Sequence, residues 1–367
     1  MPTVADLCDY LESFAPRTLA ESWDNVGLLV GNRGATLTRI MTCLTVTPQT
    51  AREAIEHRAE LIVTHHPVLF RPVQRLTADD RQGRMLLELI RAGVSIYSPH
   101  TSFDSTAGGI NELLASRLGL DGIKPLRPAK SSPTVKLVVF VPAGDLEEVS
   151  RAMFDAGAGV IGEYRDCSFR VAGTGSFFGS EASHPTVGQA SRREEVEEFR
   201  LEVLCPRARL DGVLEAMRRA HSYEEPAIDI YPLADVATSA GSGRFGTLAT
   251  PINLESLALH VKSTLESPLV QVVGPRWMLV RRVAVGCGSG GDFHAEAAAA
   301  ECDVLVTGEA SFHRQLEAED SKTALVLAGH FATERFAVVH LAEKLAREFP
   351  SLDVSACQSE LDPAWLV

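Results

Sequence analysis

The chain has 367 residues, of which 45% are hydrophobic and 23% are charged, and its formal net charge is −13. This length predicts two domains, or one domain with a large insertion, and the composition is typical of a globular protein with a sizeable core. The acidic charge argues against partners such as nucleic acid or an anionic membrane, because both require a basic patch on the protein.

Residues 1–16 predict an amphipathic helix, because Asp6, Asp9 and Glu12 interrupt its apolar positions. This segment lacks the basic start and the unbroken apolar centre of a signal peptide. No apolar run reaches the roughly 18 residues that a transmembrane helix needs. The seven cysteines are scattered and none forms a CxxC pair, which is typical of buried thiols in a reducing compartment. We therefore expect a cytoplasmic protein.

Short β-rich and helical segments alternate from residue 38 onward. Strands are predicted at residues 39–47, 60–66 and 94–100, and helices at residues 48–59, 80–93 and 107–119. This alternation indicates a parallel sheet covered by helices.

The pattern changes at residues 123–133, which carry three prolines and are expected to be a connector. A strand at 134–142, a helix at 145–159, a glycine-rich strand-like segment at 167–189, a strand at 196–206 and a helix with a strand at 209–233 follow. They predict a small inserted α+β domain. A flexible stretch at 237–246 then leads back to α/β segments at 281–309 and 323–349.

Three predicted strands of the main α/β unit end on residue types that bind metals. The candidates are His65 and His66, then His100 with Asp104, then His330 with Glu334. Ligands collect beyond the carboxyl ends of the strands in open α/β sheets. His330 and Glu334 are four residues apart, so a helix that begins near His330 places both on one face.

Three histidines with two carboxylates exceed the three or four protein ligands of a mononuclear site and suit two divalent ions. Imidazole and carboxylate fit Zn, Fe, Mn, Co or Ni and do not choose among them. The alternative is that the histidines are solvated or cap strand ends. Two adjacent histidines alone would not distinguish metal ligands from solvated or capping side chains. Three such strand ends together favour a metal site.

Three further features each leave two interpretations open. Asp24 and Asn25 either cap a turn or fix the tautomer of a histidine that binds the metal. The loop at residues 285–293 either makes tight turns or presents N–H groups to a phosphate. Glu309 and His313 either transfer protons or support other site residues.

Seven motifs along the chain resemble those of the Nif-three-like dinuclear metal centre proteins, which are also labelled GTP cyclohydrolase type two homologues. The motifs, in chain order, are ESWDNVGLLVG, HHPVLF, YSPHTSFDSTAGGINELLA, SYEEPAIDIYPL, GSGRFGTL, DVLVTGEASFH and LAGHFATER. The resemblance covers essentially the whole chain.

The resemblance implies two related α/β lobes with a di-metal cleft, at residues 1–130 and 236–367, assembled into a toroidal homohexamer. It implies an inserted ferredoxin-like domain, similar to the PII and CutA proteins, at residues 131–235. It also places the metal ligands on His65, His66, Asp104, His330 and Glu334, with His100 and His313 lining the site. Many relatives carry Asp where this chain has Thr45, so an acid does not assist the metals there.

Two functions compete. In the first, the protein is a metal-dependent hydrolase of a nucleotide-like substrate, in which Glu309 or His313 moves protons and two ions activate water. In the second, it is not an enzyme. It stores, delivers or senses metal, or it is a regulatory scaffold whose inserted domain binds an effector.

Overall fold

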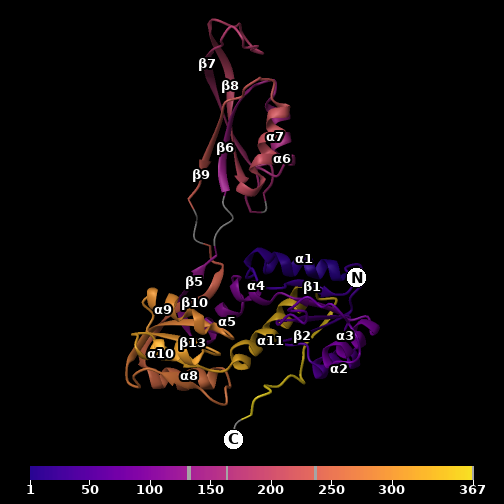
Figure 1. Cartoon of the computed structure of the whole chain (residues 1–367), viewed down its shortest axis with the longest axis vertical. Helices are drawn as coiled ribbons and strands as arrows, with labels where there is room; N and C mark the ends of the chain where they lie inside the picture. The colour runs from indigo at the N-terminus through magenta and orange to yellow at the C-terminus, as the bar shows by residue number, and fades with distance from the viewer. Residues whose placement is uncertain (130–133, 163, 235–237, 366–367) are drawn as a thin grey trace. The chain divides into compact units, whose positions relative to one another are not determined.

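The computed structural model describes residues 1–129, 134–162, 164–234 and 238–365. The chain divides into two compact units, one made of Met1–Ala129 with Thr238–Val367 and the other of Lys130–Ala237. Figure 1 shows the elements of both units along the chain. Among the described residues, no helix combines the length and apolar character needed to span a membrane.

The first unit contains a five-stranded sheet in the order β1-β4-β3-β2-β15, in which only β1 is antiparallel to its neighbour. Its strands are β1 (Gly27–Val30), β2 (Arg39–Cys43), β3 (Leu61–Thr64), β4 (Ser95–Ser98) and β15 (Asp353–Ala356). The helices in this part of the chain are α1 (Val4–Phe14), η1 (Arg17–Leu19), α2 (Pro48–Glu56), α3 (Arg81–Arg91), α4 (His100–Ser105) and α5 (Ile110–Arg117). Every residue of β3 and β4 is buried, as expected for central strands covered on both faces.

Strand β2 ends at Cys43, four residues earlier than the sequence predicts. The backbone N–H groups of Leu44 and Thr45 donate to the carboxylate of Glu360 instead of continuing the strand, at 2.9 and 2.7 Å. Thr47 then caps α2, which has Pro48 in its first turn. A carboxylate from the far end of the chain therefore sets this strand end, and local sequence does not reveal it.

The same unit contains a six-stranded sheet in the order β11-β14-β13-β12-β10-β5. Its strands are β5 (Leu120–Pro128), β10 (Gly241–Asn253), β11 (Gln271–Val273), β12 (Leu279–Gly286), β13 (Val304–Thr307) and β14 (Ala324–Leu327). Strands β12, β13 and β14 are parallel and the others are antiparallel. The helices that follow along the chain are α8 (Leu254–Thr264), η3 (Gly290–Phe293), α9 (His294–Ala299), α10 (Phe312–Glu319) and α11 (His330–Glu348). Helix α11 packs on β2 and β15 of the five-stranded sheet, and α5 packs on β5 and β10 of this one.

The proline-rich segment that the sequence predicts to be a connector is largely strand β5. It pairs with β10 at the edge of the six-stranded sheet. Proline is tolerated there because an edge strand does not need every N–H group for pairing. Residues 130–133 of the expected connector lie outside the described residues.

The second unit is a four-stranded antiparallel sheet in the order β7-β8-β6-β9. Its elements are β6 (Thr134–Pro142), α6 (Leu146–Asp155), β7 (Ser168–Phe178), β8 (Arg193–Pro206), η2 (Arg207–Arg209), α7 (Leu210–Ala220) and β9 (Ile228–Pro232). Helices α6 and α7 lie together on one face of the sheet (Figure 1) and share an apolar core with it.

Arg244 on β10 is a fully buried charge within the first unit. Its guanidinium donates to the carbonyl oxygens of Gly241, Gly243, Ser105, Thr106 and Ser239, and it pairs with Glu112 at 3.4 Å. Strand β10 is thereby held to α4 and α5, which come from the N-terminal segment of this unit. Buried charges are tolerated only when they are hydrogen-bonded in this way.

We expect the Arg244→Met substitution to lower the free energy of unfolding of the first unit by about 3 to 5 kcal/mol. The substitution would leave several buried carbonyl groups without a donor. All three tryptophans, Trp23, Trp277 and Trp365, belong to this unit, so denaturant titration followed by tryptophan fluorescence measures the change.

Arg276→Met is the matched control, because Arg276 is exposed and pairs with Glu255 at the surface. We expect it to cost only a small fraction of the loss seen for Arg244. Equal effects of the two substitutions would contradict the structural role of Arg244.

Candidate metal centre

Four histidines reach the site from three strand ends of the first unit. His65 and His66 follow β3, His100 opens α4 directly after β4, and His330 opens α11 after β14. The backbone bends at His65 and His66, so both rings turn toward the site, with centroids 5.0 Å apart. On a straight strand, adjacent side chains point to opposite faces. The bend is therefore what allows His65 and His66 to reach the same cluster.

Glu334 is the centre of the cluster. The Nε2 atoms of His66 and His330 each lie 3.1 Å from its Oε2, and the Nε2 of His65 lies 3.8 Å from its Oε1. Burial opposes ionisation of Glu334, but hydrogen bonding to His330 and His66 outweighs it and holds the pKa well below its usual range. The hydrogen bond to Glu334 in turn raises the pKa of His330 to about 9.

Asp104 completes the set of five residues implied by the resemblance. Its Oδ1 lies 3.6 Å from the Nε2 of His65. Burial, followed by repulsion from Glu334, raises the pKa of Asp104 to about 7. Two carboxylates in one buried cluster repel each other, and a divalent cation between them would relieve the repulsion.

Thr45 contacts His66, although the sequence indicated no role for it. Its hydroxyl oxygen lies 2.7 Å from the Nδ1 of His66, while the opposite ring nitrogen faces Glu334. A histidine that binds a metal through Nε2 carries its proton on Nδ1, which would donate to Thr45. The group that contacts this face of His66 is thus a neutral hydroxyl rather than an acid.

Asp24 both caps a helix and orients a site histidine. Its Oδ1 lies 2.7 Å from the Nδ1 of His100, and its Oδ2 accepts from the backbone N–H of Thr101 at 3.1 Å. Despite its burial, these bonds lower the pKa of Asp24 to about 2. Among the described residues, Asn25 makes no hydrogen bond to a histidine, and its side chain donates to the carbonyl of Leu69.

The two candidate proton-transfer residues are placed differently. Glu309 lies with its Oε1 3.4 Å from the Nδ1 of His330, and its other oxygen accepts from Ser289 at 3.1 Å. His313 lies exposed on α10, and among the described residues no hydrogen bond or ion pair joins it to the cluster.

The glycine-rich loop at residues 285–293 makes a tight turn beside the cluster. The N–H groups of Cys287, Gly288 and Gly291 already donate to Asn111, Thr333 and Glu309, respectively. Because these three N–H groups already have acceptors, they are not available to a phosphate, and they favour the interpretation that the loop makes a tight turn.

A Cβ atom on Gly288, which has φ of 57°, would lie 2.1 Å from a carboxylate oxygen of Glu334. Glycine is required there because any side chain would fill the centre.

The residues fit a metal site. The structure contains two groups of potential metal ligands, one formed by His65, His66 and His100 and the other by His66, His330 and Glu334. Within each group, the potential ligand atoms all lie within 4.8 Å of one another. The Nδ1 of His65 is buried without a hydrogen-bond partner. Neighbouring Cys287 is a thiol rather than a thiolate, because burial raises its pKa well above its usual range. The donors in the two groups are imidazole and carboxylate, which suit first-row divalent ions.

A cavity of about 470 Å³ opens onto the cluster. Its rim includes Trp23 and Phe70, whose ring centroids lie 5.8 Å apart. Arg127 contributes a positive charge, which is paired with Glu296. Other lining residues are Glu21, His66, His100, Thr101, Asp104, Ser105, Asn111, Ser242, Cys287, Ser289, Gly290, Asp292, Phe293, His330 and Glu334.

Comparison with known proteins gives one consistent result. The model of the family described as Duf34/NIF3 (NGG1p interacting factor 3) matches residues 2–364. A protein of Halalkalibacterium halodurans is 39% identical over 319 residues, which are 87% of this chain and 86% of the relative. One of Mycobacterium tuberculosis is 37% identical over 365 residues, 98% of this chain and 96% of the relative. Both are named "GTP cyclohydrolase 1 type 2 homolog".

Solved structures agree with the sequence relatives. A Bacillus cereus protein described as related to NIF3 superposes with a TM-score of 0.76 at 34% identity, over 100% of this chain and 99% of the other. Staphylococcus aureus protein SA1388 gives a TM-score of 0.84 at 26% identity, with the same coverage. The mixed α/β architecture with several sheets is therefore shared along the whole chain.

We expect metal affinity to rise with pH between 6 and 9. A metal ligand must be unprotonated, whereas without metal His330 keeps its proton up to about pH 9 and Asp104 up to about pH 7. Between pH 7 and 9 the logarithm of the affinity should rise by about one per pH unit, and more steeply below pH 7. Competition with a chelator of known protonation constants measures the slope.

His330→Asn should flatten the slope between pH 7 and 9, because the residue that releases the proton is gone. His184→Ala, in an exposed loop of the inserted unit, should leave the profile unchanged. An affinity that does not vary with pH in the unsubstituted protein would contradict the assignment.

Proposed function

Because the chain belongs to the Duf34/NIF3 family, we propose that it is a metal-dependent hydrolase that acts on a nucleotide-like substrate. One observation carries the proposal: three histidines and two carboxylates from separate segments converge at the base of a cavity of about 470 Å³. The relatives' name, which refers to a GTP cyclohydrolase, makes a purine nucleotide the first substrate to test.

His65, His66, Asp104, His330 and Glu334 would hold two divalent ions, with Zn, Fe, Mn, Co and Ni as candidates. When bound, such ions polarise a carbonyl or phosphoryl oxygen and activate water. The Oε2 of Glu334 lies 3.1 Å from the Nε2 atoms of both His66 and His330, which supports Glu334 as one of the residues that would hold the ions.

The surrounding residues orient the ligands and handle protons. Thr45 and Asp24 fix the ring orientations of His66 and His100. Glu309 lies at the cluster and has one carboxylate oxygen on Ser289, so it is positioned to accept and return a proton. Trp23 and Phe70 offer aromatic faces at the rim, on which a planar base can stack.

The alternative function is not enzymatic. The same ligands would serve a protein that stores, delivers or senses metal, or a scaffold regulated through its inserted unit. The rate of metal exchange distinguishes the two functions. A trafficking site releases its metal readily to an acceptor, whereas a hydrolase retains the metal and shows turnover.

We also propose that the inserted unit is a ferredoxin-like domain similar to PII and CutA. Its element order, β6-α6-β7-β8-α7-β9, and its fully antiparallel sheet support this assignment. The seven cysteines are all free, which supports a reducing cytoplasm as the location.

We expect His65→Ala and Glu334→Ala to abolish hydrolysis of GTP by the metal-loaded protein and to lower its metal content below that of the unsubstituted chain. The loss should exceed the roughly 10- to 100-fold typical of residues that only support metal ligands. Turnover and elemental analysis of the same samples measure both effects. His184→Ala is the control, and turnover that survives the two ligand substitutions would refute the mechanism.

Glu309→Gln should lower kcat by about a hundredfold while metal content is retained, since general acid–base catalysis contributes on this scale. His313→Ala is the matched comparison from the adjacent helix. A fall in kcat for His313→Ala, with no change for Glu309→Gln, would indicate that His313 transfers the proton and Glu309 does not.

We propose a toroidal homohexamer as the assembly, and large exposed apolar side chains such as Leu259, Trp277 and Leu279 support self-association of the first unit. Light scattering of the eluting protein should give about 238 kDa, six times the 39.6 kDa of one chain. A mass of one or two chains at micromolar concentration would contradict the hexamer.

A further inference from the structure

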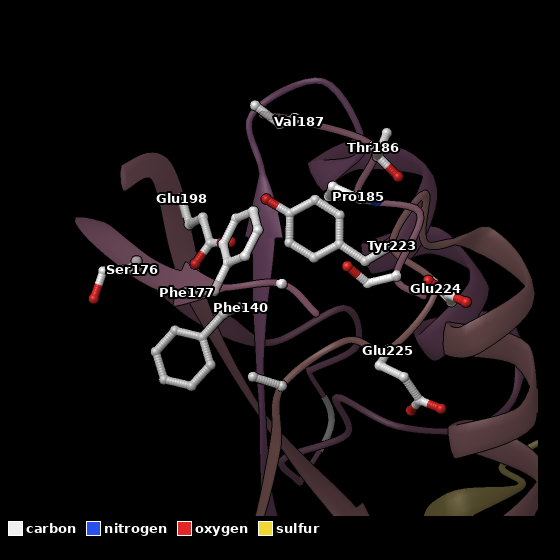
Figure 2. A pocket seen from close by; sticks show the side chains of 14 residues that line it. Phe140, Ser176, Phe177, Pro185, Thr186, Val187, Glu198, Tyr223, Glu224 and Glu225 are labelled. Carbon is white, nitrogen blue, oxygen red and sulfur yellow. The ribbon is translucent and has the colours of Figure 1, made fainter. Parts of the chain in front are cut away.

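The inserted unit contains its own cavity of about 400 Å³ (Figure 2). The floor comes from strands β6, β7 and β8, and the walls come from two loops, at residues 183–187 and 223–227. The lining includes Phe140, Phe177, Glu198, Tyr223, Glu224 and Glu225. The volume is within the range of small-molecule sites in proteins.

The two loops are joined to each other by hydrogen bonds. Thr186 donates its hydroxyl to the carbonyl of Ser222 at 2.6 Å, and the N–H of His184 donates to the Glu224 carboxylate at 3.1 Å. Buried His221 holds the second loop to the sheet, because its Nε2 donates to the carbonyl of Phe140 and its Nδ1 accepts from the N–H of Tyr223. The cavity therefore has fixed walls.

Two polar groups of the lining, one on the floor and one on the second loop, lack hydrogen-bond partners. The hydroxyl of Tyr223 is buried and has no hydrogen-bond partner. Burial, followed by the proximity of Glu198, raises the pKa of this phenol, so it is a neutral donor and acceptor at physiological pH. Within the described residues, the half-buried carboxylate of Glu198 makes no hydrogen bond or ion pair. Figure 2 shows the Tyr223 hydroxyl directed toward the side of the pocket where Glu198 and Phe177 lie.

Gly175 makes room for the Glu198 carboxylate. A Cβ atom at residue 175 would lie 2.2 Å from the Oε2 of Glu198. The carboxylate of Glu198 can therefore occupy this position only because residue 175 on β7 is glycine.

The charge of the cavity defines the ligand. Glu198, Glu224 and Glu225 line it, and none of its described lining residues is lysine or arginine. Two arginines contact lining residues from outside. Arg200 lies 5.8 Å from the centroid of the Phe140 ring and is paired with Glu202, and Arg193 donates to Ser176. A phosphate or carboxylate would be repelled, whereas a cation would be attracted.

We propose that this cavity binds a small organic cation, a protonated amine carried on an apolar body. The ammonium group would donate to Glu198 and Tyr223, the two groups without partners. The rings of Phe140, Phe177 and Tyr223 would enclose the apolar body and attract the cation through their faces. This site does not depend on the proposed hydrolase activity.

Three matched probes test the proposal with the full-length chain by isothermal titration calorimetry. They are 2-phenylethylamine, which is protonated at neutral pH, and 2-phenylethanol and 3-phenylpropionate, which carry the same ring with a neutral or an anionic head group. We expect the amine to bind at least about tenfold more tightly than the alcohol, because hydrogen bonds to a charged group are the stronger ones. The carboxylate should not bind measurably.

Glu198→Gln keeps the size of the side chain and removes its charge, and should weaken amine binding at least about tenfold. Tyr223→Phe should weaken it about threefold or more. Glu215→Gln is the control, because Glu215 is exposed on α7 of the same unit and pairs with Arg219, and it should leave the affinity unchanged.

Equal affinities for the three probes, a preference for the carboxylate, or an unchanged affinity in Glu198→Gln would overturn the proposal. A change in self-association of the Glu198→Gln protein, with no change in its affinity for the amine, would also overturn the proposal. That result would indicate that the cavity receives a side chain from a second copy of the chain.

Discussion

The buried carboxylate of Glu334 is the constraint on which the candidate metal centre depends. A carboxylate that is 4% exposed is tolerated only if positive charge or hydrogen-bond donors surround it. His66 and His330 supply these contacts from β3 and α11, at 3.1 Å each. His65 adds a further potential ligand beside His66, and Glu309, from the loop after β13, lies beside His330. A metal ion would replace the protons that the histidines otherwise carry, so the same geometry satisfies the carboxylate with or without the ion.

The centre can form because two sheets share one apolar core. Val63 beside the first sheet's histidines and Val285 beside the glycine turn belong to the same buried cluster. Arg244 adds a polar connection between the two halves by donating to carbonyl groups on both sides. Strand ends from different parts of the chain are thus fixed relative to one another before any ligand binds, which is the preorganisation that a metal site requires.

The inserted unit has a different chemistry from the metal centre. Its cavity combines aromatic rings and carboxylates without histidine, and its unpaired groups, Tyr223 and Glu198, are suited to an organic cation rather than to a first-row metal ion. A protein with two such sites can respond to two kinds of small molecule, and this applies equally to a regulated hydrolase and to a scaffold.

Local sequence determined the elements and the ligand types. The alternation of apolar runs with helical segments located β3, β4, α2 and α3, and the histidines and carboxylates at the strand ends identified the residues that converge. Only tertiary structure decided which groups support them. The Thr45 contact with His66, the Asp24 contact with His100, the Glu360 carboxylate that ends β2 and the buried Arg244 all join residues that lie at least 21 positions apart. Periodicity reports which face of an element is buried, but it carries no information about the partner that a polar side chain meets across such a distance. The local sequence likewise did not predict that the proline-rich segment forms a strand, because this strand depends on pairing with β10, more than a hundred residues later in the chain.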